Sequence, residues 1–270
     1  MTTILFWNIR RQPILEQIVT LSHTYNVDIL LLAESSISND SLEMSLNEGQ
    51  EALYFPDYGF PNQLQIYSRY LHSYFIPIND RRGIAIRHLI PPIGRNILIV
   101  TAHLPSKIFQ KEHDQIFASV RLANIIADAE KKVGHNRTVL IGDLNMDPFE
   151  HGVVAADGLH ALSDRRIVKR GSRNVEGVRR NFFYNPMWNF FGDMNNTPPG
   201  TYYFDSGKHV NIYWHLFDQI LIRPSLLDAF RKENIKIITD ISGVSLLAES
   251  GRPNIRDSSD HLPIILTLDL

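Results

Sequence analysis

The strongest constraint on the fold is a set of short apolar runs that each meet a polar residue at one end. The polar residues at these junctions are Asn8, Glu34, His103, Asp143 with Asn145, Asp218, and Asp260 with His261. Apolar runs of about 4–8 residues are typical of buried strands, whereas carboxylates, amides and imidazoles at their ends need a partner or a counter-charge. The pattern therefore predicts one shared polar site at the edge of a sheet.

The order of the expected elements favours an α/β chain. Residues 3–7 predict a strand, Pro13 opens a helix, and residues 28–33 predict a second, buried strand. Further strands are expected at 64–67, 83–86, 96–102, 138–142, 217–222, 235–239 and 262–268. A longer helix over 111–132 should end at Gly134. Its predicted apolar stripe consists of Ile116, Val120, Ala123 and Ala127.

Two stretches predict loops. Residues 35–61 indicate an irregular insert beside the site, and residues 150–215 indicate mostly loop with many aromatic side chains. We see no internal repeat, low-complexity tract or linker. Residues 1–270 are therefore predicted to form a single domain, and this length is enough to bury a large core.

Composition narrows the chemistry and the location. The chain has no cysteine, which excludes disulfides, thiolate metal sites and cysteine nucleophiles and fits a cytoplasmic protein. No apolar stretch is long enough to span a bilayer, and the Met1-Thr2-Thr3 start lacks a signal-peptide pattern. We therefore expect a cytoplasmic protein without a membrane segment.

Electrostatic recognition must be local, because the formal net charge is only −2. The clearest local signal is a basic segment with Arg165, Arg166, Lys169, Arg170, Arg173, Arg179 and Arg180, diluted only by Asp164 and Glu176. A solvated loop and a phosphate-contacting loop explain this segment equally well.

The junction motifs together resemble the endonuclease/exonuclease/phosphatase superfamily, which includes pancreatic deoxyribonuclease, abasic-site endonucleases and inositol-phosphate phosphatases. The matching segments follow the family's order: Trp7-Asn8-Ile9, Glu34, Thr101-Ala102-His103-Leu104, Gly142-Asp143-Leu144-Asn145, Phe217-Asp218-Gln219-Ile220-Leu221 and Ser259-Asp260-His261. The resemblance implies an α/β (α+β) fold, a four-layer α/β/β/α sandwich with two mixed β-sheets packed face to face and helices outside.

A magnesium site is expected at Glu34, a carboxylate just past a buried strand, with help from Asn8 and Asp260. Mg²⁺ takes one or two direct carboxylates and completes its shell with water and substrate phosphate, and Mn²⁺ can substitute. Taken alone, Glu34 would be interpreted as an acid at a surface strand end.

The resemblance also implies roles for the other junction residues. Asp143 would orient or deprotonate the attacking water, and Asn145 would donate a hydrogen bond to a phosphate oxygen. A tight turn after a strand is the alternative for this pair. His103 and His261 are the candidate donors to the phosphorus centre, where negative charge builds up. Asp218 is expected to orient His261 and hold it protonated.

Departures from the family pattern concern the substrate. Arg10, which is followed by Arg11, stands two residues after Asn8, where many members carry Asp or Asn, so Arg10 is predicted to approach a phosphate instead of a metal. His103 replaces the tyrosine usual in abasic-site endonucleases, and Gln219 follows Asp218 where inositol-phosphate phosphatases usually have arginine. The motifs therefore define the chemistry better than the substrate.

Basic and aromatic residues in segment 165–215 predict a single-stranded or distorted nucleic acid as the ligand. The expected substrate contacts are Arg10, Arg11, Arg179, Arg180, Tyr184, Trp188, Tyr202 and Trp214. The alternative is that the aromatics, including Phe182, Phe190 and Phe191, form a small core that anchors a long loop.

The leading functional hypothesis is a Mg²⁺-dependent phosphodiesterase, a nuclease that cleaves DNA or RNA by in-line attack of water on phosphorus. The alternatives are a phosphatase or phosphodiesterase for a nucleotide, lipid head group or other small phosphoester, and a non-catalytic nucleic-acid-binding module. Open points are endo- or exonucleolytic action, one or two metals, the general base and the oligomeric state.

Overall fold

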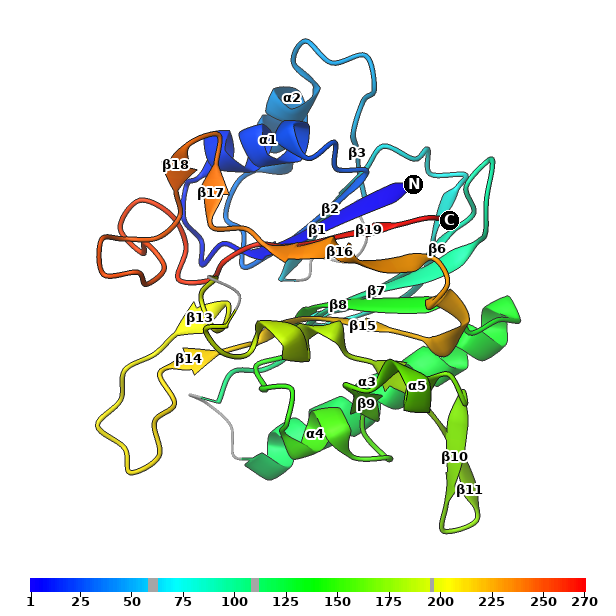
Figure 1. The fold of residues 1–270 in the computed structure, drawn as a ribbon. Coiled ribbons are helices and arrows are strands. Elements are labelled where there is room, and N and C mark those ends of the chain that lie inside the picture. Colours follow the sequence, from blue (N-terminus) through cyan, green and yellow to red (C-terminus); the bar gives the residue numbers. More distant parts are fainter. Residues whose placement is uncertain (58–62, 108–111, 195–196) are drawn as a thin grey trace.

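Two large mixed sheets pack face to face with helices on the outside, as predicted (Figure 1). The structure is a computed structural model, and it describes residues 1–57, 63–107, 112–194 and 197–270. Helices α1 (Leu15–Thr24) and α2 (Asn39–Asn47) lie outside the first sheet. Helix α3 (Glu112–Val133) lies outside the second sheet, with the short α4 (His151–Val154) and α5 (Arg165–Val168).

The first sheet has six strands. Its order is β16 (Phe230–Ile237), β19 (Ile264–Leu268), β1 (Thr2–Asn8), β2 (Ile29–Ala33), β4 (Leu64–Ser68) and β3 (Phe55–Pro56). Strands β1 and β2 are parallel, because α1 returns the chain to the start of the sheet between them. The last strand, β19, pairs with β1 in the antiparallel sense, so the two ends of the sequence lie side by side.

The second sheet has seven strands. Its order is β5 (Phe75–Arg81), β6 (Ile84–Leu89), β7 (Ile97–His103), β8 (Thr138–Asp143), β15 (Asp218–Ile222), β12 (Phe183–Tyr184) and β9 (Ala161–Leu162). Strands β7 and β8 are parallel, and α3 connects them. Parallel neighbours end at the same edge of a sheet, so the polar residues that end β7 and β8 meet there.

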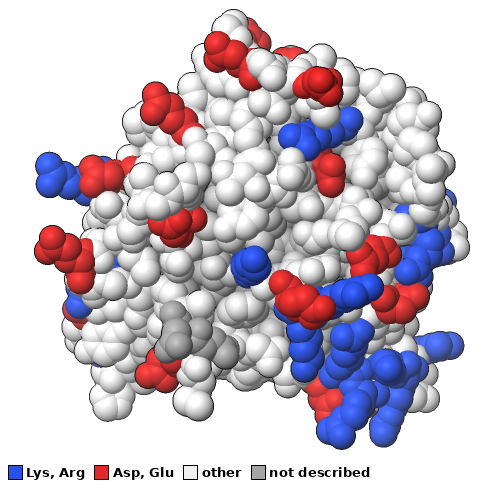
Figure 2. All heavy atoms as spheres, turned by 45° about the horizontal axis from the view of Figure 1, so that its top comes forward, with Lys and Arg blue, Asp and Glu red and all other residues white. Residues whose placement is uncertain are grey.

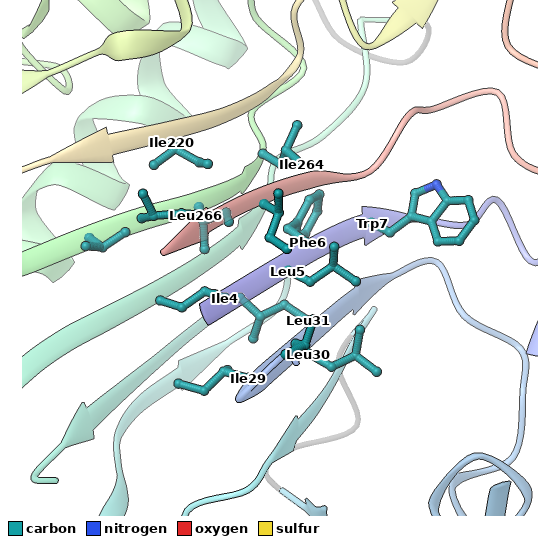
Figure 3. Close-up of a cluster of buried hydrophobic side chains, with 14 of the residues drawn as sticks. Ile4, Leu5, Phe6, Trp7, Ile29, Leu30, Leu31, Ile220, Ile264 and Leu266 are labelled. Atoms are coloured by element: carbon teal, nitrogen blue, oxygen red, sulfur yellow. The ribbon is translucent and has the colours of Figure 1, made fainter. Parts of the chain in front are cut away.

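The main hydrophobic core lies between the two sheets. Phe6 and Ile264 of the first sheet pack with Ile220 of the second (Figure 3). A smaller apolar cluster joins the outer face of the second sheet to α3 through Leu122 and Ile126. Each sheet is thus apolar on the face that it buries, and polar side chains gather at the strand ends.

The short elements complete the described chain. They are the hairpin strands β10 (Ser172–Val175) and β11 (Val178–Asn181), β13 (Tyr202–Tyr203) and β14 (Trp214–His215), β17 (Asp240–Ile241) and β18 (Val244–Ser245), and the 3₁₀ turns η1 (Pro186–Phe190) and η2 (Pro224–Leu226). None of the helices in the described part of the chain has the length and apolar character needed to cross a bilayer.

Several expectations for the elements were wrong. The stretch 35–61, expected to be irregular, contains α2, whose N-cap Ser38 accepts a hydrogen bond from the Ser41 amide, and also β3; residues 58–62 lie outside the described part. The stretch 150–215 contains short helices and hairpins rather than mostly loop. On α3 the buried stripe is shifted to Gln115, Ser119, Leu122, Ile126, Ala129 and Glu130.

Candidate active site

The predicted junction residues meet where the two sheets present their strand ends. Asn8 closes β1 in the first sheet, and Asp143 closes β8 in the second. The Asn8 Nδ2 donates a hydrogen bond to Asp143 Oδ2 at 3.0 Å and so joins the two sheets. His103 and Asp218 are the strand partners of Asp143 on either side, in β7 and β15.

A glycine permits the close approach of β7 and β8 beside the site. Gly142 precedes Asp143, and a Cβ atom there would lie 1.9 Å from the carbonyl oxygen of Ala102. That distance is far inside van der Waals contact, so a side chain at residue 142 would push the two strands apart. Glycine is therefore required at the point where His103 and Asp143 are presented.

Glu34 and His103 form an ion pair at the edge of the site. Glu34 follows β2 with a left-handed backbone (φ 50°), a conformation uncommon for residues other than glycine. Its Oε1 lies 3.3 Å from His103 Nε2 and 3.4 Å from Asn8 Nδ2. The hydrogen bond to His103 is the main cause that lowers the pKa of Glu34 to about 2. Burial disfavours the charge on His103, but Glu34 and Asp143 raise the pKa of His103 above its ordinary value.

Asp143 is the central carboxylate. Its side chain is 1 % exposed, and its Oδ2 faces His103 Nε2 at 3.8 Å and His261 Nε2 at 4.0 Å. Its Oδ1 accepts the backbone N–H of Asn145 at 2.8 Å. The Asn8 amide of β1, the His103 ring of β7 and the His261 ring before β19 therefore all face the same oxygen of Asp143.

Asn145, like Glu34, has a left-handed backbone conformation (φ 51°), and it lies beside Asp143. Its side-chain amide donates to the Leu104 carbonyl at 2.8 Å, and its own carbonyl accepts from Gln115 at 2.9 Å. One hydrogen of the Asn145 Nδ2 is thus used within the protein. The second hydrogen is the one that could serve a phosphate oxygen.

Asp218 and His261 form a buried pair. The His261 Nδ1 and Asp218 Oδ2 are 2.8 Å apart, and the Asp218 backbone N–H donates to Thr201 Oγ1 at 3.2 Å. Burial opposes the charge on His261, but the negative charge of Asp218 and this hydrogen bond raise the pKa of His261 to about 10. The proton on Nδ1 faces Asp218, so Nε2 is directed toward Asp143. The Trp7 indole N–H donates to the His261 carbonyl at 2.9 Å and fixes this segment on β1.

The donor set fits a hard divalent cation. Oxygens of Glu34 and Asp143 lie around the Asn8 amide, and no thiolate is present. Asp143, Asp218 and His261 also offer ligand atoms within 4.8 Å of one another, among the residues that the structure describes. Since Asp218 and His261 already bind each other, Glu34 and Asp143 are the carboxylates left for Mg²⁺ or Mn²⁺.

Solved structures with a similar fold align with nearly the whole chain. The AP endonuclease from Archaeoglobus fulgidus matches with a TM-score of 0.58 and 14% identity, covering 100% of both chains. D. rerio TDP2 complexed with single strand DNA product matches with 0.56 and 17%, covering 100% of this chain and 99% of that one. An endonuclease/exonuclease/phosphatase family protein from Leptotrichia buccalis matches with 0.56 and 14%, covering 100% of both. The chain has the endonuclease/exonuclease/phosphatase fold.

Neither the family models nor the curated proteins include a match to this sequence. At such low identities the likeness shows the fold, and the roles of individual residues rest on the geometry of this chain. Five polar residues meet at one edge of the two sheets: Asn8, Glu34, His103, Asp143 and His261. We refer to this candidate site as the catalytic edge.

Arg10, Asp260 and Tyr202 lie at the rim of this edge. Arg10 has a left-handed backbone (φ 46°), and its half-exposed guanidinium pairs with Asp260 at 3.4 Å. Asp260, a predicted metal ligand, is therefore neutralised by Arg10 in this structure. The Tyr202 ring lies 4.7 Å from the His261 ring, and Tyr202 is partly exposed. Arg11, next to Arg10, is exposed, and its backbone N–H donates to the Glu34 carbonyl.

Three predicted substrate contacts lie away from the edge where Asp143 is found. Tyr184 lies in β12 and is only 2% exposed, so its ring cannot stack on a base. Arg179 and Arg180 lie in the β10–β11 hairpin, which leads into β12. Tyr184 pairs with Ile222, and Ile222 pairs with Val139 near the start of β8. The hairpin is therefore at the end of the strands opposite Asp143 (Figure 1).

Trp188 and Trp214 pack mainly on other aromatic rings. The Trp188 ring lies 6.4 Å from Phe149, and the Trp214 ring meets Tyr203 edge-on at 5.4 Å. Both tryptophans are partly exposed. Phe182 belongs to the main hydrophobic core, and Phe190, Phe191 and Trp214 pack against it, so these aromatics extend the main core.

Sequence reasoning missed a second carboxylate–imidazole pair near the site. His215 Nδ1 and Asp147 Oδ2 are 2.7 Å apart, and the Leu216 backbone N–H donates to Asp147 Oδ1 at 2.8 Å. The His215 ring stacks on Phe217 at 4.6 Å, and Phe217 in turn stacks on Tyr202 at 5.4 Å. Asp147-Pro148 resembled a simple turn, and the available signal was the histidine three residues before Asp218.

Proposed function

We propose that this protein is a divalent-metal-dependent phosphodiesterase that cleaves nucleic acid. The observation that carries the proposal is the convergence of the Asn8 amide, His103 and His261 on Asp143 Oδ2. Few structural needs explain two imidazoles with raised pKa values and a buried carboxylate at one sheet edge. Phosphoryl transfer needs this combination of a base, positive donors and a site for a cation.

Each residue then has a distinct task. Asp143 accepts the proton of the attacking water or orients that water in line with the leaving oxygen. His103 and His261, whose pKa values are both raised, donate hydrogen bonds to phosphoryl oxygens as negative charge builds up there. Asp218 is a positioning residue that keeps Nε2 of His261 directed into the site. Glu34, with Asp143, would hold Mg²⁺ or Mn²⁺, which neutralises charge on the phosphate when bound.

A nucleic-acid substrate is supported by the rim of the site. Tyr202 offers a partly exposed ring beside His261, and Arg10 offers a half-exposed guanidinium. An aromatic face stacks a base, and a guanidinium pairs with a phosphate. The similar TDP2 structure contains a single strand DNA product, which favours the same class of substrate here.

The test is cleavage of labelled single- and double-stranded DNA and RNA by wild type and Asp143→Asn, with Mg²⁺, with Mn²⁺ and with EDTA. We expect shorter labelled strands with wild type and metal only. The same reactions are assayed for inorganic phosphate, whose release without strand scission would indicate a phosphatase. Absence of cleavage with both metals on every substrate would refute the proposal.

A further inference from the structure

A strongly basic arm stands apart from the candidate active site. We define it as residues 164–181, which comprise α5, Lys169, Arg170 and the β10–β11 hairpin. It has seven Lys and Arg side chains against two Asp and Glu, in a chain whose net charge is −2. Figure 2 shows Lys and Arg side chains gathered at the lower right of one face of the molecule, and Figure 1 shows the β10–β11 hairpin projecting from the body at the lower right of its own view.

The base of the arm is fixed to the body of the protein. Asp164 caps α5 by accepting the backbone N–H groups of Arg166 and Ile167. Arg165 stacks over the Phe230 ring at 5.7 Å and donates to the Phe230 carbonyl at 3.2 Å. Arg173 donates from Nε to His160 Nε2 at 2.9 Å. These contacts fix the position of the hairpin and leave its outer cations to face solvent.

The cations of the hairpin are arranged on both of its faces. Arg173 and Arg180 are direct cross-strand partners, so they lie on one face. Arg179 is paired with Asn174 and lies on the other face. Like charges directly opposite each other destabilise a hairpin, and a two-stranded ribbon this short has little stability to spare. An external anion beside the Arg173–Arg180 pair would remove that repulsion, and Arg179 offers a cation to an anion on the other face.

Further cations lie at the foot of the hairpin. Lys169 and Arg170 are exposed, and neither shows an ion pair or side-chain hydrogen bond with the residues that the structure describes. The exposed apolar groups nearby are Ile167 and Val178, which are too few to insert into a bilayer. The recognition chemistry of the arm is therefore almost purely cationic.

We propose that this arm docks double-helical nucleic acid at a place separate from the catalytic edge. A two-stranded ribbon fits the major groove of a duplex, where phosphates flank it on both sides. A flat anionic membrane or an acidic protein surface would neutralise only one face of the ribbon. Lys169 and Arg170 then contact the backbone beside the groove. The proposed function supplies the substrate class, whereas docking itself needs no catalysis.

The position of the arm sets the length of duplex that can reach both places. The hairpin lies beyond the start of β8, and Asp143 is at its end. A strand of this length spans about 20 Å, since each residue advances roughly 3.3 Å. A duplex that touches arm and active site must therefore extend over at least ~6 base pairs, at about 3.4 Å each. A small phosphodiester cannot reach the arm.

The experiment compares wild type with Lys169→Gln/Arg170→Gln, and uses Lys131→Gln/Lys132→Gln at the end of α3 as the control with equal charge loss. Binding of a labelled duplex of about 30 base pairs, well above the ~6 base pairs of the span, is measured in EDTA over a range of salt. The arm variant should lose about ten-fold in affinity and about two in the slope of log affinity against log salt, whereas the control keeps both. Hydrolysis of bis(4-nitrophenyl) phosphate with Mn²⁺ should be equal in all three proteins.

Each outcome decides between the arm and the active site. Equal affinity and slope in wild type and arm variant, or an equal loss in the control variant, would overturn the docking proposal. Tighter binding of wild type to anionic phosphatidylglycerol vesicles than to duplex would do the same and indicate a membrane. Duplex binding that depends on the arm, without hydrolysis of any substrate, would support the docking proposal and refute the proposed function.

Discussion

His103 is the last residue of β7 and lies at the catalytic edge. His88 belongs to the neighbouring strand β6 and pairs with Leu98, near the opposite end of β7. At the start, His88 and His135 face each other with their Nε2 atoms 3.2 Å apart and Arg137 nearby. Burial and Arg137 lower the pKa of His88, and together with His88 they lower the pKa of His135 to about 4. At the catalytic edge, Glu34 and Asp218 raise the pKa values of His103 and His261.

The difference lies in the neighbours of the rings. Each catalytic-edge histidine faces a carboxylate whose effect on the pKa outweighs the cost of burial, so its charged form is favoured. The histidines at the opposite end face each other and the Arg137 guanidinium, so their neutral form is favoured. A buried histidine thus becomes a donor for an anion only where the strand ends also supply an acid. Substitutions at the two ends should therefore have different consequences.

The largest expected effect is that of Asp143→Asn. The amide keeps the shape of the side chain but can neither accept a proton nor balance His103 and His261. Metal-dependent cleavage should fall by about 10³-fold, measured as the initial rate on a labelled oligonucleotide. His135→Gln is the matched change at the other end and should keep the wild-type rate. Equal losses in both variants would mean that the two ends do not differ as described.

His261→Gln should have the next largest effect. Glutamine can still donate a hydrogen bond, but it carries no charge and leaves Asp218 without its cation. The rate should fall by about 10²-fold, the usual cost of losing one donor to a developing anion. Circular dichroism and thermal unfolding serve as controls for folding. A wild-type rate in this variant would remove His261 from the mechanism.

Glu34→Gln should change metal dependence more than maximal rate. The amide is a weaker ligand for a hard cation, and it no longer holds the His103 proton in place. The Mg²⁺ concentration for half-maximal rate should rise about ten-fold, measured by titration after removal of metal with EDTA. An unchanged half-maximal concentration would show that Glu34 does not bind the cation.

The smallest effect concerns the neutral histidines and appears only in acid. The folded pKa of His135 is about 4, below its ordinary 6.5, so the unfolded chain binds more protons between these values. Stability should therefore fall as the pH drops from about 6.5 toward 4. Because the ring is partly exposed, the loss attributable to His135 is about 1 kcal/mol. Urea unfolding of wild type and His135→Gln at several pH values measures it, and parallel pH profiles would contradict it.

The sequence was informative wherever an apolar run ended in a polar residue. Such runs must be buried, so the strands carrying Asn8, Glu34, His103, Asp143 and Asp218 were located to within a residue or so. Their convergence followed from the parallel pairing of β1 with β2 and of β7 with β8. Helix α2 was missed because its polar sequence has little apolar periodicity, and its Ser38 cap was mistaken for a loop residue.

Local sequence patterns could not predict the positions of residues that depend on pairing between distant strands. Arg179 and Tyr184 are near one another in sequence and seemed suited to substrate, but β12 pairs with the far end of β15. That pairing buries Tyr184 and turns the hairpin away from Asp143. The Asp147–His215 contact spans 68 residues and has no local signature. Local sequence defines strand ends, whereas the register between distant strands decides which of them meet.

The Trp7–His261 hydrogen bond has a consequence for biosynthesis. It ties β1 to a segment that the ribosome adds 254 residues later. A ribosome-bound fragment that stops before His261 therefore lacks one of the polar residues that meet Asn8 and Glu34 at the catalytic edge. A nascent chain can therefore complete this site only after His261 has been made.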